Sequence, residues 1–257
     1  MKFINRFTTF FPALIVACTL GFVAPPATAW DWTWGAKVSG SGTIKSETRN
    51  VSGFTGISLS LPAKVEIVQG YTEGISIESD DNILPLIETV VEDGKLRLSF
   101  RERNMSVSTK TLNIKVNVKT LDNLSVAGSG DLRAATLKVA ALKTSIAGSG
   151  DVRIASLDVD TLIVSIAGSG DFSAGGKANT VEGKIAGSGD LKIETLAANN
   201  VKISIAGSGD AKVWAKDTLK ISVAGSGDVA YYGDAKVTQS VAGSGSVKRL
   251  GNAPAGS

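Results

Sequence analysis

The chain has 257 residues, of which 43% are hydrophobic and 20% charged, and its formal net charge is +3. This composition is typical of a folded protein and excludes a disordered one, while the small net charge gives no basis for nucleic-acid binding. The sequence contains no histidine, which removes the commonest general base and every Ser-His or Cys-His catalytic arrangement.

Residues 1–29 have the features of an export signal peptide. A positive start (Lys2, Arg6) is followed by an apolar run from Phe10 to Ala24, and Ala27-Thr28-Ala29 forms a cleavage motif. The apolar run is too short to be a good membrane span. We therefore expect export to the periplasm, the outer-membrane surface or the medium.

A second interpretation of the leader uses its cysteine. Ile15-Val16-Ala17-Cys18 resembles a bacterial lipobox, in which Cys18 would carry the lipid of a lipoprotein. If the chain is cleaved after Ala29 instead, the mature protein has no cysteine and its core alone must hold the fold.

Residues 30–37 form a Trp-rich segment that begins Trp30-Asp31-Trp32-Thr33-Trp34. In an extended chain these three indoles share one face, because side chains alternate along a strand. We interpret the segment as a cap over the first coil of the fold. The alternative is a sticky strand for a partner or a glycan.

Residues 38–124 show strand-like alternation without a clear period. The alternating segments are Ile57–Leu61, Lys64–Val68, Ile75–Glu78, Leu96–Phe100 and Leu112–Val118. Asp93-Gly94 predicts a tight hairpin turn. The segment from Val38 to Lys45 resembles the repeat described next, and we interpret it as a degenerate early copy. Residues 38–124 are therefore assigned to irregular coils of the same fold.

Residues 125–250 contain a regular repeat. Ala-Gly-Ser-Gly-Asp occurs six times, and a seventh copy ends in Ser. The copies begin at Ala127, Ala147, Ala167, Ala186, Ala206, Ala224 and Ala242, at intervals of 20, 20, 19, 20, 18 and 18 residues. A unit this short cannot bury its own apolar side, whereas stacked units bury a continuous core. Residues 251–257 form a polar tail.

Three apolar columns run through the aligned copies. They precede the Ala (Val126, Ile146, Ile166, Ile185, Ile205, Val223, Val241), follow the Asp (Leu132, Val152, Phe172, Leu191, Ala211, Val229, Val247) and lie further on (Leu142, Leu162, Val181, Val201, Leu219, Val237). The pattern predicts an all-β fold, a right-handed parallel β-helix (solenoid) with about 18–20 residues per coil. An antiparallel meander would need more turn motifs than the repeat contains.

Several segments resemble the head GIN domain family of bacterial proteins. The similar segments are Arg49–Leu59, Val65–Gly70, Asp80–Pro85 and Val91–Leu96, followed by the Gly-Ser-Gly-Asp repeats, so the resemblance covers about residues 38–250. The family carries the label of an auto-transporter adhesin and is otherwise a domain of unknown function. The resemblance implies an exported β-helical protein and supplies no functional residues.

The repeated loop has a structural and a functional interpretation. Consecutive N–H groups of a Gly-rich loop can bind an anion, but a phosphate loop would also need a following helix and a Gly-Lys-Ser/Thr motif. We interpret the glycines as corner residues. The stacked Asp residues (Asp131, Asp151, Asp171, Asp190, Asp210, Asp228) would repel one another by roughly 0.9 kcal/mol per pair at about 4.8 Å.

Basic residues offer one way to relieve this repulsion. Two positions after the Asp or Ser come Arg133, Arg153, Lys192, Lys212 and Lys248, on the same face of the strand. We predict a mixed-charge stripe; a calcium ladder is the alternative. No metal site and no cofactor are predicted.

The C-terminal repeats contain three aromatic residues at positions that are small or aliphatic elsewhere. We consider Trp214, Tyr231 and Tyr232 to be weak candidates for a binding patch. No amphipathic cap follows the last repeat, which predicts a homo-oligomer through the ends of the solenoid or a docking surface there.

The uniform Asp column does not separate a catalytic acid from a base, and we find no active site. The sequence predicts a non-enzymatic envelope or surface protein that acts in adhesion, as a scaffold or in ligand binding. Its expected partner is an unidentified protein or glycan at the cell envelope, not nucleic acid. The alternative is a β-helix enzyme that acts on polysaccharides.

Overall fold

The computed structural model describes residues 37–102 and 105–254. The predicted signal peptide, the Cys18 alternative and the Trp-rich segment up to residue 36 therefore lie outside the described residues.

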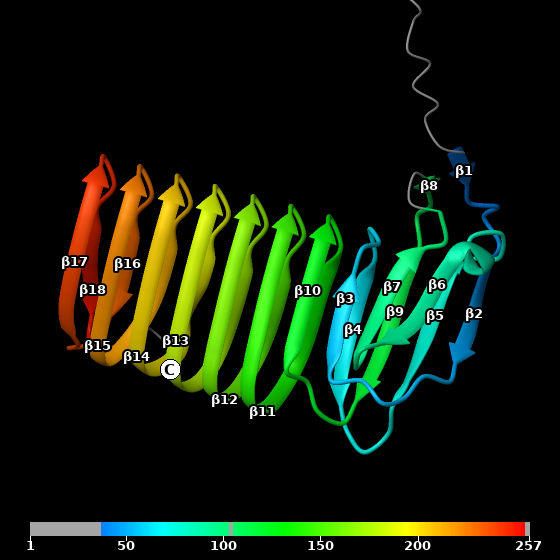
Figure 1. Cartoon of the computed structure of the whole chain (residues 1–257), viewed down its shortest axis with the longest axis horizontal. Coiled ribbons are helices and arrows are strands. Elements are labelled where there is room, and N and C mark those ends of the chain that lie inside the picture. Colours follow the sequence, from blue (N-terminus) through cyan, green and yellow to red (C-terminus); the bar gives the residue numbers. More distant parts are fainter. Residues whose placement is uncertain (1–36, 103–104, 255–257) are drawn as a thin grey trace, which may run out of the picture. The chain divides into compact units, whose positions relative to one another are not determined.

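The described chain consists almost entirely of β-strands (Figure 1). The N-terminal region contains β1 (Lys37–Ser39), β2 (Ile44–Arg49), β3 (Gly56–Leu59), β4 (Lys64–Gln69), β5 (Gly74–Asp80), the 3-10 turn η1 (Leu84–Leu86), β6 (Ile87–Glu92), β7 (Lys95–Phe100), β8 (Ser106–Ser108), β9 (Leu112–Val118) and β10 (Asn123–Gly128). The repeats form β11 (Asp131–Gly148), β12 (Val152–Gly168), β13 (Phe172–Gly187), β14 (Leu191–Gly207), β15 (Ala211–Gly225), β16 (Val229–Tyr232), β17 (Lys236–Gly243) and β18 (Val247–Gly251).

The repeats stack as a parallel β-solenoid, as the sequence predicts. Each long strand bends round one coil and pairs in parallel with the strands before and after it. Val126 pairs with Ile146, and Ile146 pairs with Ile166 one coil later, so equivalent positions of the repeat lie in register. The spacing of the repeat in the sequence is thus the length of one coil.

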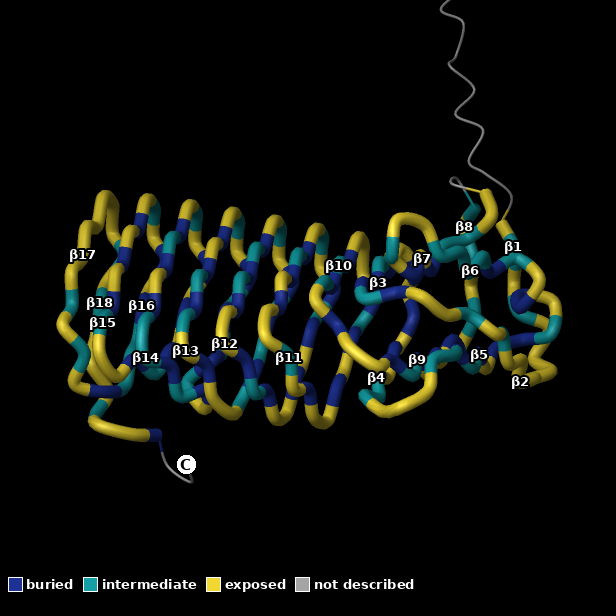
Figure 2. The backbone as a smooth tube through the Cα atoms, turned by 60° about the horizontal axis from the view of Figure 1, so that its bottom comes forward, coloured by how far each residue is buried: buried dark blue, intermediate teal, exposed yellow. Residues whose placement is uncertain are grey.

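The predicted apolar columns form the core of this solenoid. Their members from Val126 to Val229 are buried, and the burial pattern repeats from coil to coil (Figure 2). A further column that the sequence alignment did not identify contains Leu137, Leu157 and Leu196, which are also buried. In these columns only the members in the last described coil are partly or fully exposed, because no described strand packs on them.

Glycine is required at both positions of the Gly-Ser-Gly corner. Gly168 has a φ of +124°, and a Cβ added to it would lie 2.4 Å from the carbonyl oxygen of Gly148. A Cβ on Gly170 would lie 2.2 Å from the carbonyl oxygen of Gly150. The structural interpretation of the glycines is confirmed, since the backbones of successive coils approach too closely for any side chain.

The N-terminal region only partly follows the solenoid pattern. β3, β4, β7 and β9 pair in parallel and continue the stack of the repeats, with β3 against β10 and β4 against β11. In contrast, β5 is antiparallel to both β2 and β9, and β6 is antiparallel to β7. The β6–β7 hairpin turns at Asp93-Gly94, where both residues have positive φ, as predicted.

The interpretation of residues 38–45 as a degenerate coil is wrong. β2 runs antiparallel to β5, and its Ile44 is 43% exposed instead of contributing to the core. The Gly40-Ser41-Gly42 loop is held by a different contact: the Gly42 N–H donates to the buried carboxylate of Asp80 at 2.6 Å. The similarity to the repeat is thus limited to the glycine loop, because the following strand has no neighbouring coil to pack on.

Thr144 is a polar residue in the core, and its replacement provides a test of the stacking. It is fully buried between Leu124 and Val164, its register partners, and its hydroxyl has no hydrogen-bond partner among the described residues. We expect Thr144→Val to raise the free energy of unfolding by about 1–3 kcal/mol, because it removes an unpaired buried hydroxyl. Thr161→Val, on an exposed position of β12, is the control and should change stability by less than about 0.5 kcal/mol in denaturant titrations.

The close approach of the corners predicts the effect of a single methyl group. Gly170→Ala should lower the free energy of unfolding by about 1–3 kcal/mol, because its Cβ meets backbone that cannot rotate away. Gly74→Ala is the matched control, since no atom lies within 4 Å of its added Cβ. Thermal melts that show equal loss of stability for the two variants would contradict the close-contact explanation.

Candidate functional site

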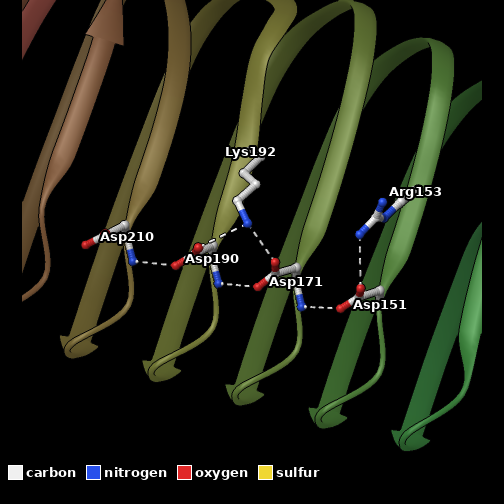
Figure 3. A network of polar contacts seen from close by, with 6 residues as sticks. All are labelled: Asp151, Arg153, Asp171, Asp190, Lys192 and Asp210. Atoms are coloured by element: carbon white, nitrogen blue, oxygen red, sulfur yellow. Dashed lines mark hydrogen bonds and ion pairs between the residues drawn. The ribbon is translucent and has the colours of Figure 1, made fainter.

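The Asp residues of the repeats from Asp151 to Asp228 form a ladder in which each carboxylate accepts a backbone N–H of the next coil (Figure 3). Asp151 Oδ1 accepts the N–H of Asp171 at 3.1 Å, and Asp171 Oδ1 accepts the N–H of Asp190 at 3.0 Å. The ladder continues through Asp210 to Asp228, which accepts the N–H and the hydroxyl of Ser246. A donor directed at each carboxylate offsets the repulsion between neighbouring charges.

Two of the predicted basic neighbours also pair with the ladder. Arg153 lies 3.3 Å from Asp151, and Lys192 Nζ lies 2.7 Å from Asp171 and 3.1 Å from Asp190. The hydrogen bond to Asp171, partly opposed by desolvation, raises the pKa of Lys192 above its usual value. Arg133 and Lys212 form no ion pair within the described part of the chain, so their charges are free to face solvent or a ligand.

The repeated loops direct their backbone donors at the protein itself. Ser169 and Gly170 donate their N–H groups to the carbonyl of Gly148 at 2.8 and 3.0 Å, and Asp171 donates to Asp151. The corresponding groups of the next two loops, at residues 188–190 and 208–210, are used in the same way. These loops therefore do not form an anion cradle.

A groove of about 1190 Å³ lies where the N-terminal strands meet the first repeats. It is lined by residues of β2, β5, β9 and β4 and of β11 to β14, which follow one another as neighbours in one sheet. One row of in-register residues crosses it, in the order Lys115, Glu66, Arg133, Arg153, Ser173, Lys192. Because neighbouring strands are about 4.8 Å apart, the groove presents polar and basic groups at regular intervals.

Small residues line part of the groove, and the strands beside them are irregular. Ala135, Ala155 and Gly175 line it, and they have little or no side chain to fill it. The register of the ladders shifts close by, between Ser173 and Gly175, and such bulges bend a strand. Glu194 also lines the groove, and its buried Oε2 atom has no hydrogen-bond partner among the described residues.

The three aromatic candidates lie outside this groove. Trp214 on β15 and Tyr232 on β16 are register partners and are half-buried. Lys216 Nζ lies 5.8 Å from the centre of the Trp214 ring. Tyr231, by contrast, packs against the core. A binding role for these residues stays a prediction.

Sequence reasoning did not find the groove. It noted Arg133, Arg153 and Lys192 as partners of the Asp ladder, but not Glu194 or the contribution of Glu66 and Lys115. The repeat period places Arg133, Arg153 and Lys192 in one row. Residues 38–124 have no such period, so the sequence does not give the register of β4 and β9, which carry Glu66 and Lys115.

Among the described residues, no group of three Asp or Glu side chains could hold a metal ion. None of the described helical segments has the length and hydropathy of a membrane span.

The ladder predicts different outcomes for two substitutions of Asp210, whose Oδ1 accepts the N–H of Asp228 at 2.8 Å. Asp210→Asn keeps an acceptor and should leave the free energy of unfolding nearly unchanged. Asp210→Ala should lower it by about 0.5–1.5 kcal/mol, because the hydrogen bond is lost. The unmodified protein should melt at the same temperature with calcium and with a chelator. Stabilisation by calcium that Asp210→Asn abolishes would instead support the calcium ladder.

Comparisons with known proteins agree with the observed fold. A crystal structure from Bacteroides fragilis, described as a "putative adhesin", is 27% identical with a TM-score of 0.78, covering 83% of this chain and 100% of that one. A structure from Parabacteroides distasonis, described as a "putative lipid binding protein", is 25% identical with a TM-score of 0.73, covering 84% and 100% of the two chains.

A third structure, a "putative adhesin" from Parabacteroides merdae, shares the fold at 24% identity and a TM-score of 0.66, with 83% and 99% of the chains covered. No curated protein matches the chain. The family model described as "Putative auto-transporter adhesin, head GIN domain" matches residues 53–235. The resemblance noted in the sequence is thereby confirmed, and the chain belongs to the head GIN domain family.

Proposed function

We propose that this chain is an exported, non-enzymatic binding protein of the bacterial cell envelope that holds an extended polar ligand, a glycan, in the groove. The observation that carries this proposal is the groove itself, which crosses strands of both the N-terminal region and the repeats. The proteins that are similar to this chain are named as adhesins or as a lipid-binding protein, and none of those names describes an enzyme.

The lining of the groove supports a chain-like polar ligand. Along one row, the basic side chains of Lys115, Arg133, Arg153 and Lys192 are interspersed with Glu66 and Ser173. An arginine guanidinium offers five donors in a planar fork, which suits hydroxyl and carboxylate oxygens. A ligand lying across these strands would meet a new polar group at each strand, a donor on every one except β4, where Glu66 is an acceptor, so a repeating polymer fits better than a compact molecule.

The rigidity of the scaffold also supports binding. The strands that line the groove, except the edge strand β2, are hydrogen-bonded on both sides, so their side chains need little ordering when a ligand binds. A preformed site avoids part of the entropy cost of association.

Binding of purified protein to immobilised acidic and neutral polysaccharides tests the proposal. Arg133→Glu and Arg153→Glu should each weaken binding at least about tenfold, because each removes charge-assisted hydrogen bonds of about 1.5–3 kcal/mol. Lys248→Glu is the matched control: it occupies the equivalent position of the last coil, outside the groove, and should bind like the unmodified protein.

Two results would overturn the proposal. One is binding to anionic phospholipid vesicles with no binding to any polysaccharide. The other is release of new reducing ends from a polysaccharide that Glu194→Gln abolishes, which would favour the polysaccharide-acting enzyme. The buried, unpaired oxygen of Glu194 makes it the carboxylate to test for that alternative.

A further inference from the structure

The last coil of the solenoid has strands with a partner on one side only. β17 pairs with β15, β18 pairs with β16, and no other described strand pairs with either. Figure 1 shows them at the end of the stack opposite the N-terminal strands. A free edge presents a row of unpaired N–H and C=O groups, which is a template for another strand.

The edge strands at the N-terminal end, β2 and β6, are protected by charge. β2 carries Lys45, Glu47 and Arg49 within six residues. The Arg49 guanidinium donates to the carbonyl of Ile87 at 2.7 Å and to that of Leu84 at 2.9 Å, so it covers acceptors beside β6. Charged side chains on an edge strand oppose pairing with a second chain.

β17 lacks this protection. From Val237 to Gly243 it contains no charged residue and no proline, so its edge is open to pairing along most of its length. Its apolar residues are also uncovered: Val241 is 39% exposed, whereas Val223, the equivalent residue one coil earlier, is buried under the last coil. Leu250 on β18 is 41% exposed. This end therefore offers unpaired backbone and apolar side chains together.

We infer that two copies of the chain pair through β17, antiparallel across a twofold axis. A second strand edge can replace water on these exposed backbone groups with a full ladder of hydrogen bonds, and the charged N-terminal edges are unsuited to this role. Pairing of two identical ends closes as a dimer, whereas end-to-start pairing would continue into a filament. A register centred on Gln239 places Val237 of one copy opposite Val241 of the other.

This dimer is independent of the proposed glycan binding. None of the residues that line the groove belongs to β17 or β18, so dimerisation leaves the groove accessible. Two copies would present two grooves on one particle, which raises the avidity for a polymer that reaches both.

Sedimentation equilibrium of the purified chain tests the dimer. At micromolar concentration we expect twice the mass of one chain. Val241→Asp should reduce it to that of a monomer, because the substitution places a charge at the pairing edge. Ile44→Asp is the matched control, since Ile44 is 43% exposed but lies on β2, and it should remain dimeric.

A second variant tests the register without relying on loss of assembly. The only cysteine of the chain is Cys18 in the predicted leader, so the protein from residue 30 onward contains none. In that protein, Gln239→Cys should form a disulfide-linked dimer under mild oxidation, because residue 239 faces its own copy across the axis. Ile44→Cys should not.

Four outcomes would overturn the inference. They are a monomer at every concentration tested, a mass that grows without limit, a Val241→Asp variant that stays dimeric, and a Gln239→Cys variant that does not cross-link. Far-ultraviolet circular dichroism identifies a variant that has lost its strands. In that case Gln239→Lys, on an exposed residue, replaces Val241→Asp and should also give a monomer, because two ammonium groups would face each other across the axis.

Discussion

The close approach of one glycine corner to the next is the contact on which the rest of this structure depends. A Cβ added to one corner would collide with the carbonyl oxygen of the preceding corner: the distance from a Cβ on Gly170 to the oxygen of Gly150 would be only 2.2 Å. This approach lets the loop amides bond to the preceding coil, and it brings the aliphatic columns into register. The Asp ladder is a consequence of the same stacking, because from Asp151 onward the carboxylate of one corner accepts the N–H of the equivalent residue in the next coil.

Function and stability are separated on this scaffold. The Asp residues that attract attention in the sequence are engaged with backbone groups, and Arg153 and Lys192 partly neutralise them. The groups that remain available, such as Arg133, lie beside them in the groove. A repeated motif is therefore a poor guide to the binding site here, since its repetition reflects a structural need at every corner. The positions that differ between coils, such as Gly175 and Glu194, give the groove its shape and chemistry.

The repeats could be predicted from sequence almost completely, and the N-terminal region could not. A fixed period gives the coil length, the register and three core columns at once, since equivalent residues must stack. The column of Leu137, Leu157 and Leu196 was not identified in the sequence, because the coil between Leu157 and Leu196 has Gly176 at this position. In residues 38–124 the five alternating segments form β3, β4, β5, β7 and β9, but alternation does not say whether neighbouring strands run parallel, so the antiparallel pairing of β5 with β2 and β9 was missed. The groove depends on that pairing and was missed with it.

The direction of the corner hydrogen bonds has a consequence for how the molecule forms. The donors at residues 169–171 all point back to acceptors in the coil that precedes them in the chain. Each coil contacts only its neighbours, so growth can proceed by addition to a finished surface. A polypeptide released amino end first can thus fold one coil at a time, with the loop donors of each arriving segment finding their acceptors already in place. The length of the protein is then open to change by duplication of one circuit, because the new segment both fits the surface before it and offers the same surface to the segment after it.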